Sequence, residues 1–256
     1  MIQLNKTVFD YRPFPIGVIS EAIAPNKYER LVNLFPPIEL FQYKESLGNK
    51  YSLSEINNPE EYHKFIKSSK EWQEFYDYIK SAEFISSVIN TLKDNNLKLG
   101  MENIPVKQKE GGGVSALISS VEDKLTKKPY LSSRFEFSML KGNGGYLLPH
   151  TDSPSKVITL VVTICKKNEW DTSHGGGTDI NDVVNEKKYF NYLNEQLKFE
   201  EVTTLKTVEF EPNQCMLFIK TFNSLHSVKP IKAPDDRLRK TLTINIEMNN
   251  SHFGIF

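Results

Sequence analysis

Apolar side chains in residues 1 to about 97 recur every three or four positions, a spacing typical of amphipathic helices. Pro25 suits the first turn of a helix, and Pro36-Pro37 ends the stripe that follows. Three stripes predict helices, at residues 25–35, 58–79 and 84–92. These stripes are interpreted as packing faces, and a short strand at 13–19 precedes them. The N-terminal region is therefore predicted to be a helical layer.

From about residue 98 the pattern changes to short alternating or apolar runs separated by turn residues, which is typical of strands. The predicted strands are 115–120, 133–140, 146–152, 157–165, 176–181, 203–211, 215–220, 226–230 and 239–248. One helix is predicted among them, at 183–199. Many short strands with few helices favour a barrel or a double-sheet jelly roll. Without a repeat or a linker, residues 1–256 are predicted to form one domain, with its β core at about 98–250.

The bulk composition restricts the classes of function. Lys plus Arg and Asp plus Glu number 32 each, so the chain lacks the basic surplus that nucleic-acid binding usually needs. Cys165 and Cys215 lie in apolar runs and are expected to be buried thiols. No apolar run is long enough to span a membrane and no signal peptide is recognisable, so we expect a cytoplasmic protein.

His150 and Asp152 carry the first chemical signal. Alternate side chains of a strand share a face, so a strand over 146–152 would direct both toward one metal ion. A third ligand must come from elsewhere in the chain, and His226, between apolar strands, is the best candidate. His63 lies in a predicted helix, and His174 lies in a loop-like run. His252 is near the chain end.

Two imidazoles and one carboxylate can occupy one face of a ferrous ion and leave other positions open. Arg239 lies 13 residues after His226, and Thr241 follows on the same strand face. A guanidinium is a planar fork suited to a carboxylate. Arg237 has the same parity as Arg239 and is its rival for this role. Arg239 is favoured because the threonine lies two residues beyond it.

These residues resemble the Fe(II)/2-oxoglutarate-dependent dioxygenases, in particular the prolyl 4-hydroxylase-like branch. The resemblance covers roughly residues 133–248. Its motifs are Phe135–Tyr146, the His-Thr-Asp triplet, Gly175–Gly177, His226–Pro230 and Arg239–Ile244. It implies a double-stranded β-helix, a jelly-roll or cupin-like core, with iron held by His150, Asp152 and His226.

By the same resemblance, Arg239 and Thr241 would bind the distal carboxylate of 2-oxoglutarate, which reacts together with O2. Prolyl hydroxylases commonly supply a second cosubstrate contact from a tyrosine on a neighbouring strand. Thr163 and Tyr146 are the candidates, and Tyr146 is equally plausible as a packing residue. The implied enzyme is a hydroxylase that releases succinate and CO2.

The substrate is not specified by these motifs. A small molecule such as a free amino acid is favoured, and a protein prolyl residue is the alternative. A non-catalytic cupin-like binding protein and a zinc hydrolase are weaker alternatives, because neither accounts for Arg239 and Thr241. Arg134, Trp170 and His174 are candidate substrate contacts. The loops at 171–177 and around Gly111 are candidate lids.

Overall fold

The protein was analysed as a computed structural model, which describes residues 1–108 and 128–249. Two antiparallel sheets form its β core. The strands of the larger sheet are β1 (Val8–Asp10), β2 (Ile16–Ile19), β3 (Gln42–Lys44), β4 (Lys50–Ser54), β5 (Leu131–Lys141), β7 (Lys156–Thr163), β10 (Cys215–Ile219) and β12 (Leu238–Met248). Their order is β1-β2-β10-β7-β12-β5-β4-β3.

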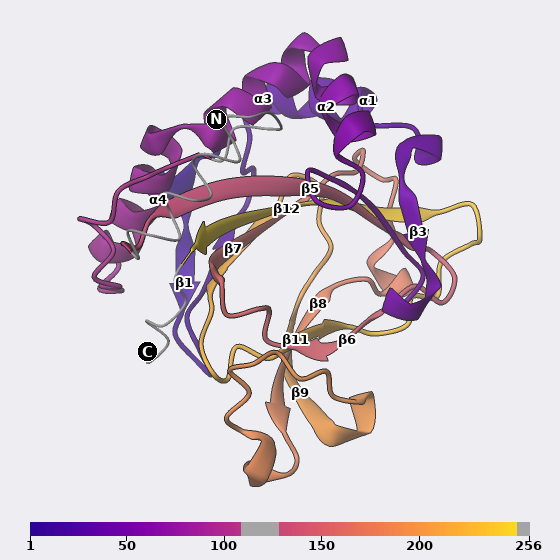
Figure 1. The fold of residues 1–256 in the computed structure, drawn as a ribbon. Helices are drawn as coiled ribbons and strands as arrows, with labels where there is room; N and C mark the ends of the chain where they lie inside the picture. The colour runs from indigo at the N-terminus through magenta and orange to yellow at the C-terminus, as the bar shows by residue number, and fades with distance from the viewer. Residues whose placement is uncertain (109–127, 250–256) are drawn as a thin grey trace.

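The smaller sheet has four strands in the order β6-β11-β8-β9. Its strands are β6 (Leu147–His150), β8 (Thr178–Val183), β9 (Val202–Val208) and β11 (His226–Val228). In Figure 1 this sheet lies on one side of the larger sheet and the helices lie on the other. Two facing antiparallel sheets confirm the predicted jelly-roll architecture.

Among the described residues, four α-helices cover the outer face of the larger sheet (Figure 1): α1 (Pro25–Asn33), α2 (Pro59–Ser68), α3 (Lys70–Lys80) and α4 (Ala82–Asp94). The stripe predicted at 58–79 is two helices, because Ser69 is extended and accepts a hydrogen bond from the amide of Trp72. Ser81 caps α4 in the same way. Side-chain hydroxyls at these positions satisfy amides that the helix leaves unpaired.

The two faces of the larger sheet have different chemistry. On β12, Leu242 and Ile246 are fully buried on the outer face with the helices, whereas Thr241 and Asn245 alternate with them. Because successive side chains point to opposite faces, the polar set faces the smaller sheet. We call this second side the inner face. Its polar residues lie in matching register across β4, β5, β12 and β7, as in the row Ser52, Ser138, Thr241 and Thr163.

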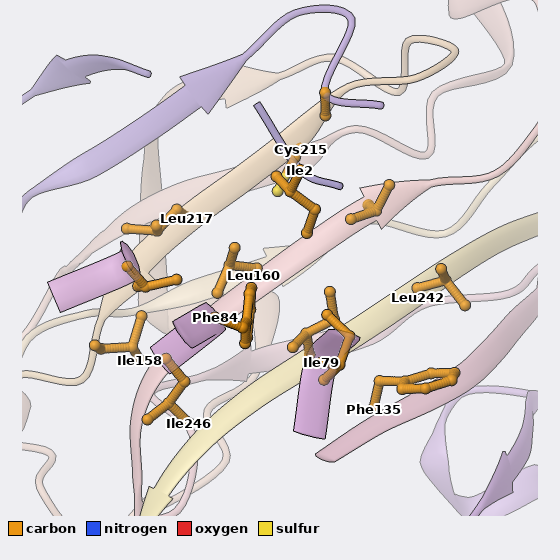
Figure 2. Packing of buried hydrophobic residues seen from close by; sticks show 14 of the residues in the cluster. Ile2, Ile79, Phe84, Phe135, Ile158, Leu160, Cys215, Leu217, Leu242 and Ile246 are labelled. Carbon is orange, nitrogen blue, oxygen red and sulfur yellow. The ribbon is translucent and has the colours of Figure 1, made fainter. Parts of the chain in front are cut away.

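The main core lies between the helices and the outer face. Figure 2 shows Ile79 and Phe84 from the helices against strand residues such as Phe135, Leu160 and Leu242. Aromatic rings thicken the layer over β5, where the rings of Trp72 and Phe137 lie 4.7 Å apart edge to face. This packing fixes the outer side of the sheet and leaves the inner face for chemistry.

Several sequence predictions differ from the structure. The helix predicted at 183–199 is wrong: that segment holds only two short 3-10 turns, Glu186–Lys188 and Phe199–Glu201. Its apolar residues are not a buried stripe, since Phe190 and Leu193 are 70% and 83% exposed, and Asn194 has a left-handed backbone. The short strand near the N-terminus is β2, and β1, β3 and β4 were not predicted.

Some predictions lie outside the described residues, namely the strand at 115–120, the loop around Gly111 and the histidine at position 252. Both cysteines, Cys165 and Cys215, are buried and free, as predicted. Among the described residues, no helix combines the length and apolar character needed to cross a membrane.

Phe137→Ala is expected to lower the free energy of unfolding by about 3–5 kcal/mol, because it leaves a cavity among aromatic rings. Phe137 is fully buried and contacts the rings of Trp72 and Phe65. Urea unfolding monitored by tryptophan fluorescence would measure the change. Leu193→Ala is the control, and its effect should stay within about 0.5 kcal/mol because the side chain is exposed. Equal effects of the two changes would contradict this account of the core.

Candidate metal centre

His150 and His226 are brought together by strand pairing. They are direct partners in the antiparallel pair of β6 and β11, and their ring centroids lie 4.4 Å apart. Side chains of directly opposed residues in such a pair point to the same side. Phe218 on the inner face packs against His226 with a centroid distance of 4.5 Å, so the two imidazoles lie between the sheets.

Asp152 reaches the same place by a different route from the one predicted. Strand β6 ends at His150, and Asp152 lies in the following turn with φ of 68°. The expected strand over 146–152 is therefore too long, and strand alternation is not what aligns the two residues. The left-handed backbone, which aspartate tolerates better than most residues, turns its carboxylate back toward the imidazoles. One ligand atom from each of His150, Asp152 and His226 lies within 4.8 Å of the others.

Backbone carbonyls orient both imidazoles. The Nδ1 atom of His150 lies 2.8 Å from the carbonyl oxygen of Leu148, and that of His226 lies 3.0 Å from the carbonyl oxygen of Ser224. A carbonyl only accepts, so each Nδ1 carries the proton and each Nε2 keeps its lone pair. Burial lowers the pKa of both rings, and that of His226 falls to about 3. Two neutral imidazoles with free Nε2 atoms are the form that binds a metal.

The carboxylate of Asp152 is ionised and held at both oxygens. Burial opposes its ionisation, but the ammonium of Lys156 holds its pKa below the usual range. Lys156 Nζ lies 2.8 Å from Oδ1, and the hydroxyl of Thr159 donates to Oδ2 at 3.1 Å. Thr159 is on the inner face of β7, so the ligand is fixed to the larger sheet as well as to the smaller one.

Thr151, between the two ligands, ties the turn to its surroundings. It is fully buried, and its hydroxyl donates to the carbonyl oxygen of Asn191 at 2.6 Å. Lys220 Nζ donates to the same hydroxyl at 2.7 Å, and the side chain of Asn194 accepts from the amide of Thr151. The segment that was predicted as a helix therefore supports the metal-ligand turn. Such outer contacts orient the ligands of metal sites.

Arg239 is a buried cation without an acid. The residue is only 5% exposed, and among the described residues no carboxylate lies within 4.0 Å of its guanidinium. Its Nε donates to the carbonyl oxygen of Gly176, a terminal nitrogen lies 3.4 Å from the hydroxyl of Thr178, and its guanidinium carbon lies 4.8 Å from the Phe210 ring centroid. Burial lowers its pKa to about 10, so it stays charged at neutral pH.

Thr241 and Arg237 were the other candidates for binding the cosubstrate carboxylate, and they lie two positions after and two positions before Arg239 in the sequence. Thr241 is buried on the inner face, directly opposite Thr163 of β7. Arg237 precedes β12, has a side chain 46% exposed and lies near Asp236. Exposure makes Arg237 a weaker anion site than Arg239, because water screens its charge.

Other predicted site residues have structural contacts of their own. Tyr146 packs edge to face on Phe199, with ring centroids 6.2 Å apart, which favours a packing role. The indole of Trp170 donates to the carbonyl oxygen of Gly175 and lies over Phe210, beside Arg239. Arg134 is on the inner face, opposite Asn245. The loop at 171–177 packs beside Arg239, with the His174 ring 5.8 Å from that of Trp170.

Comparison with solved structures identifies the fold. A prolyl 4-hydroxylase from Pseudomonas putida aligns over 93% of this chain and 95% of its own, with a TM-score of 0.53 and 10% identity. This chain has a prolyl 4-hydroxylase fold. A prolyl hydroxylase from Trichoplax adhaerens, solved with a hypoxia inducible factor peptide, aligns over 96% of this chain and 87% of its own, with a TM-score of 0.48 and 13% identity. Comparisons with family models and with curated proteins found no match.

A third solved structure in the comparison is the epimerase SnoN, crystallised with Fe3+, alpha ketoglutarate and nogalamycin RO. It aligns over 96% of this chain and 84% of its own, with a TM-score of 0.47 and 11% identity.

In this prolyl 4-hydroxylase fold, the donor set fits a divalent transition metal. Two imidazole nitrogens and one carboxylate oxygen, oriented from outside, make a facial site that is typical of non-haem iron. Sequence reasoning missed Lys156, Lys220 and Thr159, which surround Asp152 and Thr151. Lys156 lies four residues after Asp152, but no sequence pattern distinguished it from a surface lysine.

Proposed function

We propose that the protein is an Fe(II)- and 2-oxoglutarate-dependent oxygenase. It would hydroxylate an unactivated C–H bond of a small molecule such as a free amino acid, with release of succinate and CO2. The observation that carries the proposal is the buried guanidinium of Arg239, which lacks a carboxylate among the described residues and shares the intersheet space with the ligand triad. A buried cation is costly unless an anion compensates it, and a dicarboxylic cosubstrate supplies that anion.

The roles of the protein's own groups follow from their positions. His150, Asp152 and His226 would hold iron, which supplies the activation of dioxygen when it is bound. Arg239 and Thr241 would bind the distal carboxylate of 2-oxoglutarate, with Thr163 beside them. The carbonyl oxygens behind the imidazoles and the hydroxyl of Thr159 keep the ligands in place. Burial of these groups between the sheets excludes water from the reacting centre.

A protein substrate is the second candidate. The segment that supports Thr151 also exposes large apolar side chains, with Val184 at 64%, Phe190 at 70% and Leu193 at 83% exposure. Apolar groups of this size beside a site are typical of surfaces that contact another macromolecule. A protein hydroxylase would use these exposed side chains to contact the substrate chain on either side of the oxidised residue.

Succinate formation that requires both Fe(II) and 2-oxoglutarate tests the proposed function. The purified protein, freed of metal with a chelator, should regain turnover with Fe(II) and not with Zn(II). A panel of free amino acids and of peptides should then separate the two substrate classes by stimulation above the substrate-free rate. Hydrolysis of esters or amides with Zn(II), without any consumption of 2-oxoglutarate, would instead favour a hydrolase.

A further inference from the structure

The inner face carries more positive than negative charge around the metal ligands. Among the described residues, eight ionisable side chains lie on the inner face of β4, β5, β7 and β12 or belong to the ligand turn and its hydrogen-bond partners. The cations are Lys50, Arg134, Lys156, Lys220 and Arg239, and the carboxylates are Glu136, Asp152 and Glu247. The difference is an excess of two positive charges.

Two pairs in this group neutralise each other. Lys50 Nζ lies 2.6 Å from a carboxylate oxygen of Glu136, and Arg134 lies 2.8 Å from Glu247. The side chains of these pairs are 13–23% exposed, so the pairs are only partly screened by water. They contribute polarity to the inner face but no net charge.

Lys156, Lys220, Arg239 and Asp152 remain after this pairing, and Arg239 is the proposed partner of the distal carboxylate of 2-oxoglutarate. Lys156 is bound to Asp152, but that carboxylate is also the proposed iron ligand and its charge is shared. Lys220 is 6% exposed, and among the described residues no carboxylate lies within 4.0 Å of its ammonium. Its contacts include the hydroxyl of Thr151 and the face of the Tyr192 ring. Burial lowers its pKa to about 8, which leaves the ammonium form predominant at neutral pH.

Binding of iron and 2-oxoglutarate would leave the excess of two positive charges unchanged. A ferrous ion adds two positive charges and 2-oxoglutarate adds two negative charges, so they cancel in the count. The excess of two positive charges stays close to Asp152, since Lys156 contacts it and the charges of Asp152 and Lys156 both affect the pKa of Lys220. Uncompensated charge in a partly dry site is unfavourable, and a bound anion relieves it.

We infer that the substrate is a small carboxylate of amino-acid size whose carboxylate group binds to Lys156, with Lys220 adding to the positive field. This inference rests on the proposed function and defines its substrate class. Lys156 is the contact because its side chain is 22% exposed, whereas Lys220 is only 6% exposed and donates to the hydroxyl of Thr151. Electrostatic complementarity of this kind selects one charge type among otherwise similar molecules.

The test uses the twenty common free L-amino acids and their C-terminal amides as matched probes. Calorimetric binding to protein loaded with Mn(II) and 2-oxoglutarate without oxygen gives affinities that do not depend on turnover. Substrate-stimulated succinate formation with Fe(II) gives KM and kcat. At least one free acid should bind, and its amide should bind at least about tenfold more weakly.

Variants assign the contact. Lys156→Met should weaken binding of the acid about tenfold or more and leave binding of the amide nearly unchanged, while Lys156→Arg should retain most of the affinity. The matched control is Lys206→Met, since Lys206 of β9 pairs with Asp10 of β1, whose side chain is 57% exposed, and its ion pair does not involve the ligand turn. Metal affinity is measured separately for each variant, because Lys156 also touches Asp152.

Three results would overturn the inference: equal binding of acids and amides, equal weakening of both by Lys156→Met, or no binding of any free amino acid to protein that does bind Mn(II) and 2-oxoglutarate. Failure of the proposed function has a different signature. In that case 2-oxoglutarate itself does not bind the metal-loaded protein and no iron-dependent succinate forms.

Discussion

Asp152→Ala is expected to lower iron-dependent consumption of 2-oxoglutarate by at least about a hundredfold. Loss of an outer contact to a metal ligand already costs about 10–100-fold in metal affinity or activity, and loss of the ligand itself costs more. Asp152 is also the only carboxylate in the triad, so its removal leaves two neutral imidazoles for a divalent cation. His226→Ala should act in the same direction, because its Nε2 lone pair is removed.

Two measurements check this prediction: iron retained per chain after desalting, and succinate formed per minute at saturating 2-oxoglutarate. His63→Ala is the matched control for the histidine change, since His63 is on α2 and packs against the rings of Tyr62 and Tyr76. Its iron content should be that of the unchanged protein. Asp152→Ala leaves Lys156 without its ionic partner, so a thermal melt must show that the variant is folded. A folded Asp152→Ala variant with full iron-dependent turnover would refute the ligand assignment.

Alternation along strands was the most reliable guide in the sequence. The run that contains Leu242, Ile244 and Ile246 predicted both the extent of β12 and which of its faces is polar. Segments whose stability comes from tertiary contacts were missed or misread. Strand β4 has a polar sequence because it lines the inner face, and residues 183–199 have apolar spacing but remain irregular because Asn191 and Asn194 bond to the metal-ligand turn.

In the candidate site, too, some features could be predicted from the sequence and others depend on tertiary contacts. Residue types and order were enough to select His150, Asp152 and His226, which the structure brings together. Strand alternation, from which the approach of His150 and Asp152 was predicted, does not explain it, since Asp152 depends on a left-handed backbone after the end of β6. Lys156 and Lys220 could not be found from the sequence, because only the fold shows that they lie beside the ligand turn and not at the surface.

Arg239→Met should raise the KM for 2-oxoglutarate by roughly 30- to 4,000-fold, since loss of one partner from a buried charge pair costs about 2–5 kcal/mol. Iron binding should be retained, because Arg239 makes its contacts with Gly176, Thr178 and Phe210 and not with the triad. Arg239→Lys keeps a charge but loses the planar fork, so its KM should lie between those of the unchanged protein and Arg239→Met.

Arg237→Met is the decisive control, because strand parity alone does not separate the two arginines. Arg237 precedes β12 and its side chain is 46% exposed, so its removal should change the KM for 2-oxoglutarate less than about twofold. The paired measurement is the KM for 2-oxoglutarate at saturating Fe(II), with direct binding of 2-oxoglutarate to the Mn(II)-loaded protein as an independent check. If Arg237→Met weakens binding while Arg239→Met does not, the cosubstrate carboxylate lies at the strand entrance, and the buried guanidinium of Arg239 serves only to hold the Gly176 carbonyl and the Phe210 ring.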